Sequence, residues 1–381
     1  MGLIGGGEGA FIGAVHRIAA ELDGNVELVC GAFSSDATRS HRAGVKLYRL
    51  PESRSYANTS EMFAAEQALP ATERMDFVVI ATPNHTHFAI AHDALNAGFH
   101  VVCDKPVTFD LAQARTLRDI VRVSGLVFAL THNYTGYPLV KEARRIVRAN
   151  EIGPVRRVLV EYLQGWLASD VEATGSKQAG WRTDPARSGA AGCFGDIGTH
   201  AENLVEYVTG LRIESLCADL NIFVPNRRLD DDGSVLLRFA GGARGTLTAS
   251  QVAIGEENAL SLRVYGERGS IEWHQQEPNT LLVKWPDKPT EVRRTGGAGI
   301  SSAGGDATRL PSGHPEAFLE AFANIYRGAT AAIVAQRAGQ QGETTALDFP
   351  TIDDGVRGMA FIEAVVDSSR RGGQWVRFPR Y

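Results

Sequence analysis

The chain lacks the features that mark several large classes of protein. Its 381 residues include only four cysteines, which lie far apart and form no CxxC pair, so we expect no zinc site. Such cysteine usage suits a reducing compartment. No run approaches the ~20 apolar residues of a membrane span, and the first residues do not follow the pattern of a signal peptide. We therefore expect a cytoplasmic protein.

The chain also lacks any dense run of basic residues. Lysine and arginine number 39 against 44 acidic residues, which gives a net charge of −5. Nucleic-acid binding needs a basic face, so this balance argues against such a partner. With 44% hydrophobic and 22% charged residues, the composition is that of a globular protein. At roughly 100–200 residues per domain, the length predicts two domains.

The first third of the chain alternates strand and helix patterns. Apolar, strand-like runs lie at 1–4, 26–33, 77–81, 100–103 and 127–130. Helical patterns lie between them: one covers residues 14–22, a second ends at residue 97 and a third ends at residue 122. Alternation of this kind predicts an α/β domain over residues 1–130, with a doubly wound parallel sheet of the Rossmann type. Ligands of such sheets bind at the carboxyl ends of the strands.

The pattern changes over residues 131–381, where we expect a second domain of α+β type. After a helix at 139–149, strand patterns follow at 156–164, 215–223, 234–239, 243–252, 259–265, 270–274 and 280–285. Turns between several of them predict a largely antiparallel sheet. Two more helices are expected at 315–336 and 353–371, and mobile loops at 295–308 and 337–345. If helices cover one sheet face, the other needs a partner, which predicts a homodimer or homotetramer.

A glycine-rich loop follows the first strand, where a dinucleotide fold places its phosphate-binding turn. The loop reads Gly5-Gly6-Gly7-Glu8-Gly9-Ala10-Phe11-Ile12-Gly13. Backbone N–H groups of such a loop and of the following helix can approach a pyrophosphate closely. We expect these contacts from Gly5, Gly7, Gly9, Ala10, Phe11 and Ile12. The closing small residue is expected at Gly13, about three positions later than in the usual spacing.

The end of the second strand bears on the choice between NAD and NADP. An acidic residue there would bind the ribose 2′-hydroxyl of NAD. This chain has Ser34 at that position, then Ser35, Asp36 and Arg39. A serine with an arginine nearby accepts a 2′-phosphate, which favours NADP by a small margin. The alternative is that Ser34-Ser35-Asp36 forms only a turn and a helix cap.

Two further stretches carry candidate catalytic groups. In Gly192-Cys193-Phe194-Gly195-Asp196-Ile197-Gly198-Thr199-His200, a helix start would place Asp196 and His200 on one face. Asp196 could equally be no more than a helix cap. In Asp104-Lys105-Pro106, Lys105 follows a core strand, where it can stabilise a developing alkoxide or remain a solvated lysine. Pro106 also allows a cis Lys–Pro peptide bond.

These motifs together resemble the Gfo/Idh/MocA family, the group of glucose–fructose oxidoreductase and inositol dehydrogenase. The resemblance rests on the glycine loop with Gly13-Ala14-Val15-His16, on Thr82-Pro83-Asn84-His85-Thr86-His87, on Asp104-Lys105-Pro106, on Trp181-Arg182 and on Gly192 to His200. It implies a Rossmann domain, a second domain with a large open, mostly antiparallel sheet, and NAD(P)-dependent oxidation or reduction of a sugar, inositol or related polyol. Asp104 replaces the family's usual glutamate.

The resemblance also implies roles for individual residues. Lys105, Asp196 and His200 match the family's catalytic positions. The removal of a hydride from a carbinol carbon needs a base for the hydroxyl proton, and His200 titrates near the working pH. Lys105 would stabilise the alkoxide and Asp196 would orient the substrate or the imidazole, although Lys105 and His200 could exchange roles.

Other residues are expected to line the same site. A sugar offers hydroxyl groups and an apolar ring face, which suit polar and aromatic side chains respectively. For the cofactor we expect contacts from Ser34, Ser35, Arg39, Thr82, Pro83, Asn84, His87, Asp104, Lys105 and Asn133. For the substrate we expect contacts from His85, Tyr134, Gln164, Trp181, Arg182, Asp196 and His200.

Two other functions remain open at this level. The same fold permits a glycoside hydrolase that uses bound NAD transiently, which would release a reducing sugar with no net change in cofactor absorbance. A non-catalytic sensor that binds NAD(P) and a partner protein is a further alternative. The presence of Lys105, Asp196 and His200 speaks against the sensor, because a sensor needs no base.

The position of Ser34 gives a first test. If Ser34 lies at the ribose, Ser34→Asp should shift cofactor preference from NADP towards NAD, because a carboxylate repels the 2′-phosphate. The measurement is the ratio of kcat/KM values for the two cofactors. An unchanged ratio would mean that Ser34 does not contact the ribose.

Overall fold

The structure, a computed structural model, describes residues 1–340 and 348–379. They form two compact units. Unit 1 consists of Met1–Thr131 and Phe322–Val356, and unit 2 of His132–Ala321 and Arg357–Tyr381. Residues 322–356 thus group with unit 1, whereas the sequence pattern had assigned everything after residue 130 to the second domain. Most of the mobile stretch expected at 337–345 lies outside the described residues.

Unit 1 is built on a parallel sheet, as predicted. Its order is β2-β1-β3-β4-β5, and all four strand pairs are parallel. The strands are β1 (Gly2–Gly5), β2 (Cys30–Ala32), β3 (Phe77–Ala81), β4 (His100–Cys103) and β5 (Phe128–Leu130). The prediction of a strand over 26–33 was too long, since β2 covers only Cys30–Ala32. Before it, the Val29 N–H donates to the Met1 carbonyl and the Met1 ammonium donates to the Glu27 carbonyl.

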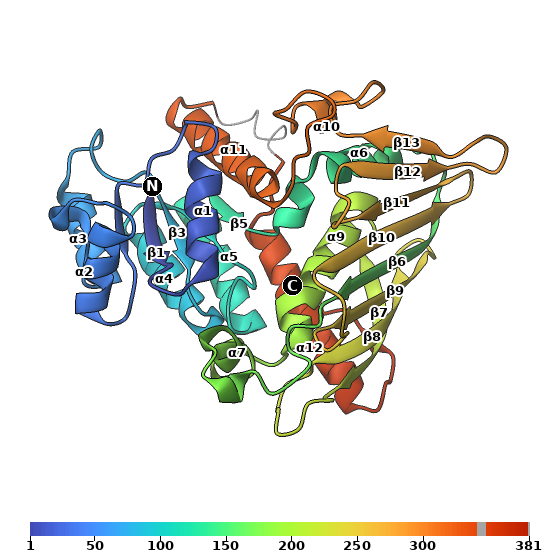
Figure 1. Cartoon of the computed structure of the whole chain (residues 1–381), viewed down its shortest axis with the longest axis horizontal. Coiled ribbons are helices and arrows are strands. Elements are labelled where there is room, and N and C mark those ends of the chain that lie inside the picture. The colour runs from blue at the N-terminus through green and yellow to red at the C-terminus, as the bar shows by residue number, and fades with distance from the viewer. Residues whose placement is uncertain (341–347, 380–381) are drawn as a thin grey trace. The chain divides into compact units, whose positions relative to one another are not determined.

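Helices cover the strands of unit 1, so β3 and β4 are buried along their whole length, and all their residues except His100 are apolar. The helices are α1 (Phe11–Glu21), α2 (Ala37–Lys46), α3 (Thr59–Ala68), α4 (His87–Asn96), α5 (Leu111–Ser124) and most of α11 (Phe318–Arg337). The start of α5 is capped by the Asp110 carboxylate, and Gly125 ends it with a φ of 66°. Figure 1 shows α1 to α5 in the blue and cyan part of the ribbon.

Unit 2 is built on a nine-stranded sheet in the order β13-β12-β11-β10-β6-β9-β8-β7-β14. Neighbours are antiparallel except β6 and β9, so the predicted antiparallel character is confirmed. The strands are β6 (Val155–Leu163), β7 (Ile213–Asn221), β8 (Asp232–Phe239), β9 (Arg244–Ser250), β10 (Ala259–Gly266), β11 (Ser270–His274), β12 (Thr280–Lys284), β13 (Glu291–Arg294) and β14 (Val376–Arg377). The edge strands β13 and β14 were not predicted.

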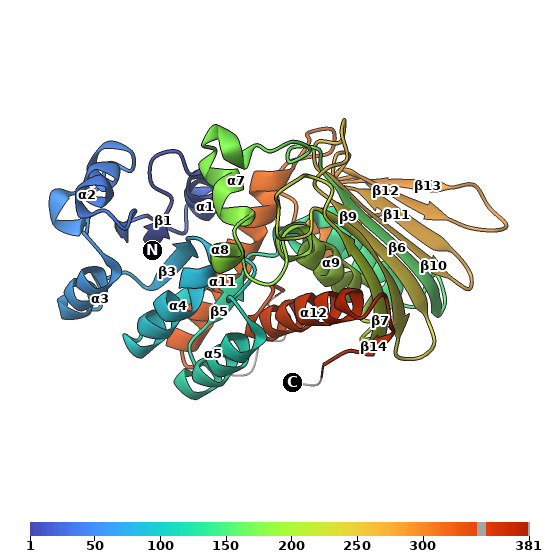
Figure 2. The ribbon, with the colours of Figure 1, turned by 90° about the horizontal axis from the view of Figure 1, so that it is seen from below.

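The two faces of this sheet differ in character. Along β8, Val235, Leu237 and Phe239 are buried, and the alternate residues are exposed. Helices α6 (Pro138–Arg148), α9 (Thr199–Thr209) and α12 (Ile352–Arg370) lie on the buried side (Figures 1 and 2). Leu236 is 48% exposed on the opposite face, which we call the open face. The predicted one-sided sheet is therefore present.

Shorter elements complete unit 2. These are α7 (Lys177–Arg182), α8 (Pro185–Ser188) and α10 (Ser302–Gly305), and α10 lies inside the stretch expected to be a loop at 295–308. No helix of the described chain is long and apolar enough to cross a membrane. Within the same residues no group of three or more His, Cys, Asp and Glu side chains is placed to hold a metal ion.

Candidate functional site

The glycine loop of unit 1 is formed by backbone that comes too close to its neighbours for side chains. A Cβ at Gly5, whose φ is 90°, would lie 2.3 Å from the Ala81 carbonyl oxygen. A Cβ at Gly7 would lie 2.5 Å from the Phe33 carbonyl oxygen. The loop is thus seated on the carboxyl ends of β2 and β3, the position of a dinucleotide-binding turn.

The loop also fixes the start of α1. A Cβ at Gly13 would lie 2.3 Å from the Gly6 Cα, so only glycine lets the helix cross the loop here. Ala10 is the N-cap of α1 and makes no side-chain cap bond. Gly13, expected to be the closing small residue, is therefore the position where α1 packs closely on the loop. The uncapped N–H groups at this helix start suit a phosphate.

The residues after β2 form a turn and a helix cap. Asp36 Oδ1 accepts the Arg39 N–H at 2.7 Å and caps α2, and Ser34 Oγ accepts the Asp36 N–H at 3.2 Å. The Arg39 guanidinium lies 3.8 Å from the Asp36 carboxylate. Its charge is thus partly compensated, which weakens the case for a dedicated 2′-phosphate site. Ser35 is exposed beside them.

The segment after β3 contains an exposed and a buried histidine. His85 is exposed, while Asn84 and His87 are buried. The two ring nitrogens of His87 lie 2.8 Å from the carbonyl oxygens of Thr82 and Pro106. His87 therefore ties the Thr82-Pro83 turn to the segment that carries Lys105, and its ring is occupied by these two backbone groups.

Asp104 orients the start of the Lys105 segment. Its Oδ1 accepts the Lys105 N–H and the Thr131 hydroxyl, each at 2.9 Å, and the Lys105–Pro106 peptide bond is cis. Burial would raise the pKa of Asp104, but His16, Lys105 and His87 hold it well below its usual range. Asp104 is therefore a carboxylate, and its hydrogen bond holds the backbone at Lys105.

A buried histidine from the resemblance motif faces Asp104. The His16 ring is fully buried, with Nε2 4.0 Å from Asp104 Oδ2 and Nδ1 2.7 Å from the Tyr326 hydroxyl. Tyr326 belongs to α11, in the part of that helix that groups with unit 1. His16 Nε2 has no hydrogen-bond partner among the described residues, so its approach to Asp104 is an electrostatic contact rather than a hydrogen bond.

In unit 2, Asp196 lies in a wide π-helical turn, Phe194–Gly198, that leads directly into α9. Such turns are often found at functional sites. The turn is held from outside by Asp230, whose Oδ1 accepts the Gly192 N–H at 2.7 Å and whose Oδ2 accepts the Phe194 N–H at 2.8 Å. Burial, reinforced by Asp231, raises the pKa of Asp230 to about 6 despite these two donors.

The Asp196 carboxylate is oriented by two side chains and does not cap its own helix. Its Oδ2 accepts from Arg182 Nε at 3.0 Å and from Gln251 Nε2 at 2.9 Å. Arg182, predicted to bind substrate, is thus also the ion-pair partner of Asp196, and only 13% of the Asp196 side chain is exposed. Trp181 packs against Arg182, with the guanidinium carbon 4.2 Å from the ring centre.

His200 is buried in the first turn of α9 among aromatic rings. Its Nδ1 lies 3.4 Å from Nδ1 of His132, and the two rings are nearly perpendicular. The Tyr134 ring packs against its edge at 4.8 Å between centres. Only one of the paired nitrogens can donate, so the pair has at least one neutral ring.

Tyr134 was expected to contact substrate, but its hydroxyl is engaged inside the unit. It bonds to the Tyr162 hydroxyl and accepts from Asn258 Nδ2 at 3.1 Å. Burial raises the pKa of Tyr134, so it is a poor proton donor. The network continues through Asn258 Oδ1 to Gln164 Nε2 at 2.7 Å. Tyr134 therefore packs against His200 as part of a rigid wall.

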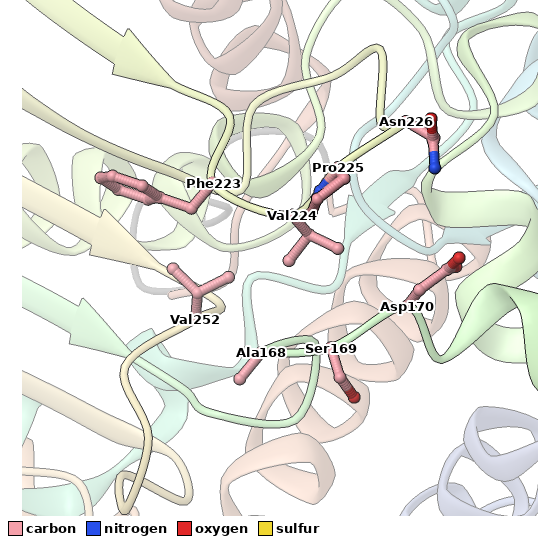
Figure 3. A pocket seen from close by; sticks show the side chains of 8 residues that line it. All are labelled: Ala168, Ser169, Asp170, Phe223, Val224, Pro225, Asn226 and Val252. Carbon is pink, nitrogen blue, oxygen red and sulfur yellow. The ribbon is translucent and has the colours of Figure 1, made fainter.

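Unit 2 also contains a hollow that the sequence did not indicate. Its volume is about 640 Å³, and Figure 3 shows the side chains around it, which come from the segments that follow β6, β7 and β9. The lining consists of Ala168, Ser169, Asp170, Phe223, Val224, Pro225, Asn226 and Val252. None of the predicted site residues is among them. Asn133, by contrast, is buried with an amide nitrogen that has no hydrogen-bond partner among the described residues.

Comparison with known proteins identifies the family. Residues 1–132 match the oxidoreductase family model with an NAD-binding Rossmann fold, and residues 140–272 match the GFO/IDH/MocA C-terminal domain. The chain belongs to the Gfo/Idh/MocA family. It is an oxidoreductase with an NAD-binding Rossmann domain, as the resemblance implied.

Individual relatives cover nearly the whole chain. An uncharacterized oxidoreductase, YfiI, of Bacillus subtilis is 32% identical over 99% of this chain and 96% of its own length. An oxidoreductase from Sinorhizobium meliloti is 45% identical over 98% of each chain, with a TM-score of 0.88. An inositol dehydrogenase homologue from Azotobacter vinelandii, solved with NADH and myo-inositol, is 35% identical over 99% of this chain and 97% of its own, with a TM-score of 0.92.

The predicted cofactor is confirmed at the level of an NAD-binding domain. The small preference for NADP finds no support in the Azotobacter homologue, which was solved with NAD+ and with NADH. Sequence reasoning missed several residues that hold the site: His132 beside His200, Gln251 and Asp230 around Asp196, and Asn258 beside Tyr134. Only His132 had a usable signal, because it stands next to the predicted Asn133 and Tyr134.

Asp230 predicts a dependence of this oxidoreductase's stability on pH. Its folded-state pKa of about 6 exceeds the ordinary value of 3.8, so the folded chain binds this proton more tightly than the unfolded chain. The resulting stabilisation is fully present below pH 3.8 and is lost as the pH rises through 6, about 3 kcal/mol in total. The unfolding free energy of the wild type minus that of Asp230→Asn should fall by about this amount between pH 4 and pH 7.

Urea unfolding at each pH measures this difference. Asp93→Asn, on the exposed surface of α4, controls for the change in net charge. A difference between wild type and Asp230→Asn that stays constant with pH would contradict the assigned pKa.

Proposed function

We propose that the protein is an NAD-dependent dehydrogenase that oxidises a secondary hydroxyl group of a sugar, an inositol or a related polyol. The observation that carries the proposal is the oriented pair of Asp196 and His200 at the start of α9. Asp196 is held by Arg182 and Gln251, and His200 is held by His132 and Tyr134. This support fits a site that must fix a proton acceptor at one hydroxyl.

His200 is proposed as the general base. If its Nδ1–H donates to His132 Nδ1, the neutral His200 ring keeps a lone pair on Nε2. That lone pair takes the hydroxyl proton as the carbinol carbon loses its hydride. The product is a ketone, and the proton remains on Nε2 until it is released to solvent.

Lys105 is proposed to stabilise the negative charge that develops on the reacting oxygen. The bonds from Thr131 and from the Lys105 N–H to Asp104 fix its backbone, and His87 fixes the following carbonyl. A charged donor aimed at a forming alkoxide lowers the barrier without reorganisation. Asp196 is proposed to accept a hydrogen bond from a neighbouring substrate hydroxyl.

NAD is the proposed cofactor, and when bound it supplies the hydride acceptor. The residues of unit 1 fit it, because Gly5, Gly7 and Gly13 leave a backbone cradle that side chains would fill. The uncapped start of α1 lies in the same loop. Compensation of Arg39 by Asp36 favours NAD over NADP. The contacts proposed for Thr82, Pro83 and Asn84 follow from their place after β3.

Mutations of the proposed base and cation test the function directly. Lys105→Ala and His200→Ala should each lower kcat by at least ~10²-fold while the Kd for NADH changes little. Activity is followed by nicotinamide absorbance across a panel of inositols and hexoses. His92→Ala and Lys46→Ala, on exposed helices of unit 1, are controls that should keep full turnover. Normal turnover in Lys105→Ala or His200→Ala would contradict the catalytic role proposed for that residue.

Self-association through the open face is also part of the proposal. Leu236 is 48% and Val292 55% exposed there, and register places Leu236 beside Thr246 and Val292 beside Leu282. A second copy would cover these side chains in a homodimer or homotetramer. The four free cysteines are consistent with assembly in the reducing cytoplasm.

Light scattering tests this assembly. The wild type should have the mass of a dimer or tetramer, and Leu236→Arg combined with Val292→Arg should yield a monomer, because charges in a packed interface are costly. Val123→Arg, at an 88% exposed position of α5, is the matched control and should leave the mass unchanged. A monomeric wild type, or a double variant that still associates, would refute the interface.

A further inference from the structure

The guanidinium of Arg182, the ion-pair partner of Asp196, lies near two tryptophan rings. The guanidinium carbon of Arg182 is 4.2 Å from the ring centre of Trp181 and 5.8 Å from that of Trp166. Trp166 is 38% exposed, so part of its indole ring is open to solvent beside Arg182. Trp181 and Arg182 were predicted from the sequence to bind substrate, whereas Trp166 was not.

The orientation of the Trp166 ring is fixed by the same network that supports His200. Its Nε1–H donates to Gln164 Oε1 at 3.0 Å, and Gln164 Nε2 donates to Asn258 Oδ1 at 2.7 Å. Asn258 in turn donates to the Tyr134 hydroxyl, and the Tyr134 ring packs against His200. An exposed aromatic face held in this way is preorganised to receive an apolar surface.

The charge of Arg182 is already compensated. Its Nε donates to Asp196 and its Nη1 to the Gln178 side chain, while Nη2 has no hydrogen-bond partner among the described residues. Two further arginines of unit 2 are compensated as well. Arg227 pairs with Glu172 and Asp231, and Arg228 pairs with Asp184.

The ion pairing of these arginines bears on whether the site binds an uncharged or a phosphorylated sugar. A phosphate group carries up to two negative charges and needs cations that are not already paired. The Arg182–Asp196 pair has no net charge and offers Nη2–H groups, which suit a hydroxyl oxygen. The cluster of Trp166, Trp181 and Arg182 therefore matches a ring with one apolar face and several hydroxyl groups better than it matches a phosphate.

We propose that Trp166 is the stacking platform for the ring of an uncharged cyclic polyol or sugar, and that Arg182 Nη2 donates to one of its hydroxyl groups. This inference rests on the proposed dehydrogenase function, and it names the substrate class of the same site. Trp166 is a binding residue that sets specificity, and it takes no part in proton or hydride transfer.

Direct binding and kinetics of matched variants test the proposal. Trp166→Ala should raise the KM for the best neutral polyol by at least ~10-fold, since a lost stacking surface weakens binding by this order. Its kcat should fall less, and Trp166→Phe should recover most of the loss. The wild type should prefer D-glucose to D-glucose 6-phosphate by at least ~10-fold in kcat/KM.

The same variants are titrated calorimetrically with myo-inositol and with D-glucose in the presence of NADH, which needs no turnover. Trp285→Ala is the matched control, because Trp285 also lies under a cation, Lys288, and donates its indole N–H to a carboxylate, Glu291. Phe223→Ala tests the hollow of Figure 3 as a competing sugar site. Both controls should leave polyol affinity unchanged.

The outcomes separate the two proposals. Dehydrogenase activity with an unchanged KM in Trp166→Ala, or with preference for the phosphorylated sugar, overturns the platform and leaves the proposed function intact. A loss of polyol affinity in Phe223→Ala would instead place the sugar in the hollow, and this result also overturns the role of Trp166. If no polyol is oxidised, the proposed function fails, and the titrations still decide whether Trp166 binds a neutral sugar.

Discussion

The proposed catalytic helix of unit 2 depends on one buried carboxylate. Asp230 accepts the N–H groups of Gly192 and Phe194, which no side chain of the turn itself caps among the described residues. The contact is close, since a Cβ at Gly192 would lie 2.4 Å from the Asp230 carbonyl oxygen. The carboxylate thus fixes the start of the wide turn. Asp196 lies in this turn, and His200 lies in the first turn of α9, which follows directly. Removal of this anchor would free both positions together.

In unit 1, different groups hold the backbone that carries the proposed catalytic residue. Its proposed catalytic lysine lies on a segment without helical support, so the backbone is fixed by Asp104, by the Thr131 hydroxyl and by the His87 ring. His16 and Tyr326 extend this support into α11, although more than 300 residues separate them in sequence. In both units, the residues proposed to react are fewer than the buried polar residues that hold them.

Much of this organisation could be read from the sequence. The parallel strands of unit 1 are continuous apolar runs, and β3 and β4 were predicted at their observed bounds because both faces are buried. The motif residues Lys105, Asp196 and His200 were found through their spacing and the family resemblance. Their supports were not found, because Asp230, Gln251 and Asn258 reach the site only through the folded sheet, from strand ends that carry no local signal. Trp166 was not predicted for a similar reason, since its exposure and its hydrogen bond to Gln164 depend on the folded structure. The grouping of residues 322–356 with unit 1 likewise depends on long-range packing.

The reaction proposed for this chain is the transfer of a hydride from a carbinol carbon to NAD. The most direct measurement uses myo-inositol and D-glucose deuterated at every carbon, incubated with NAD+ and the purified protein. Mass spectrometry of the recovered cofactor should find one deuterium per reduced nicotinamide, and the rate should fall relative to the undeuterated substrate if hydride transfer limits turnover. Reduced cofactor without deuterium, or sugar turnover that leaves the cofactor unlabelled and unreduced, would contradict the account.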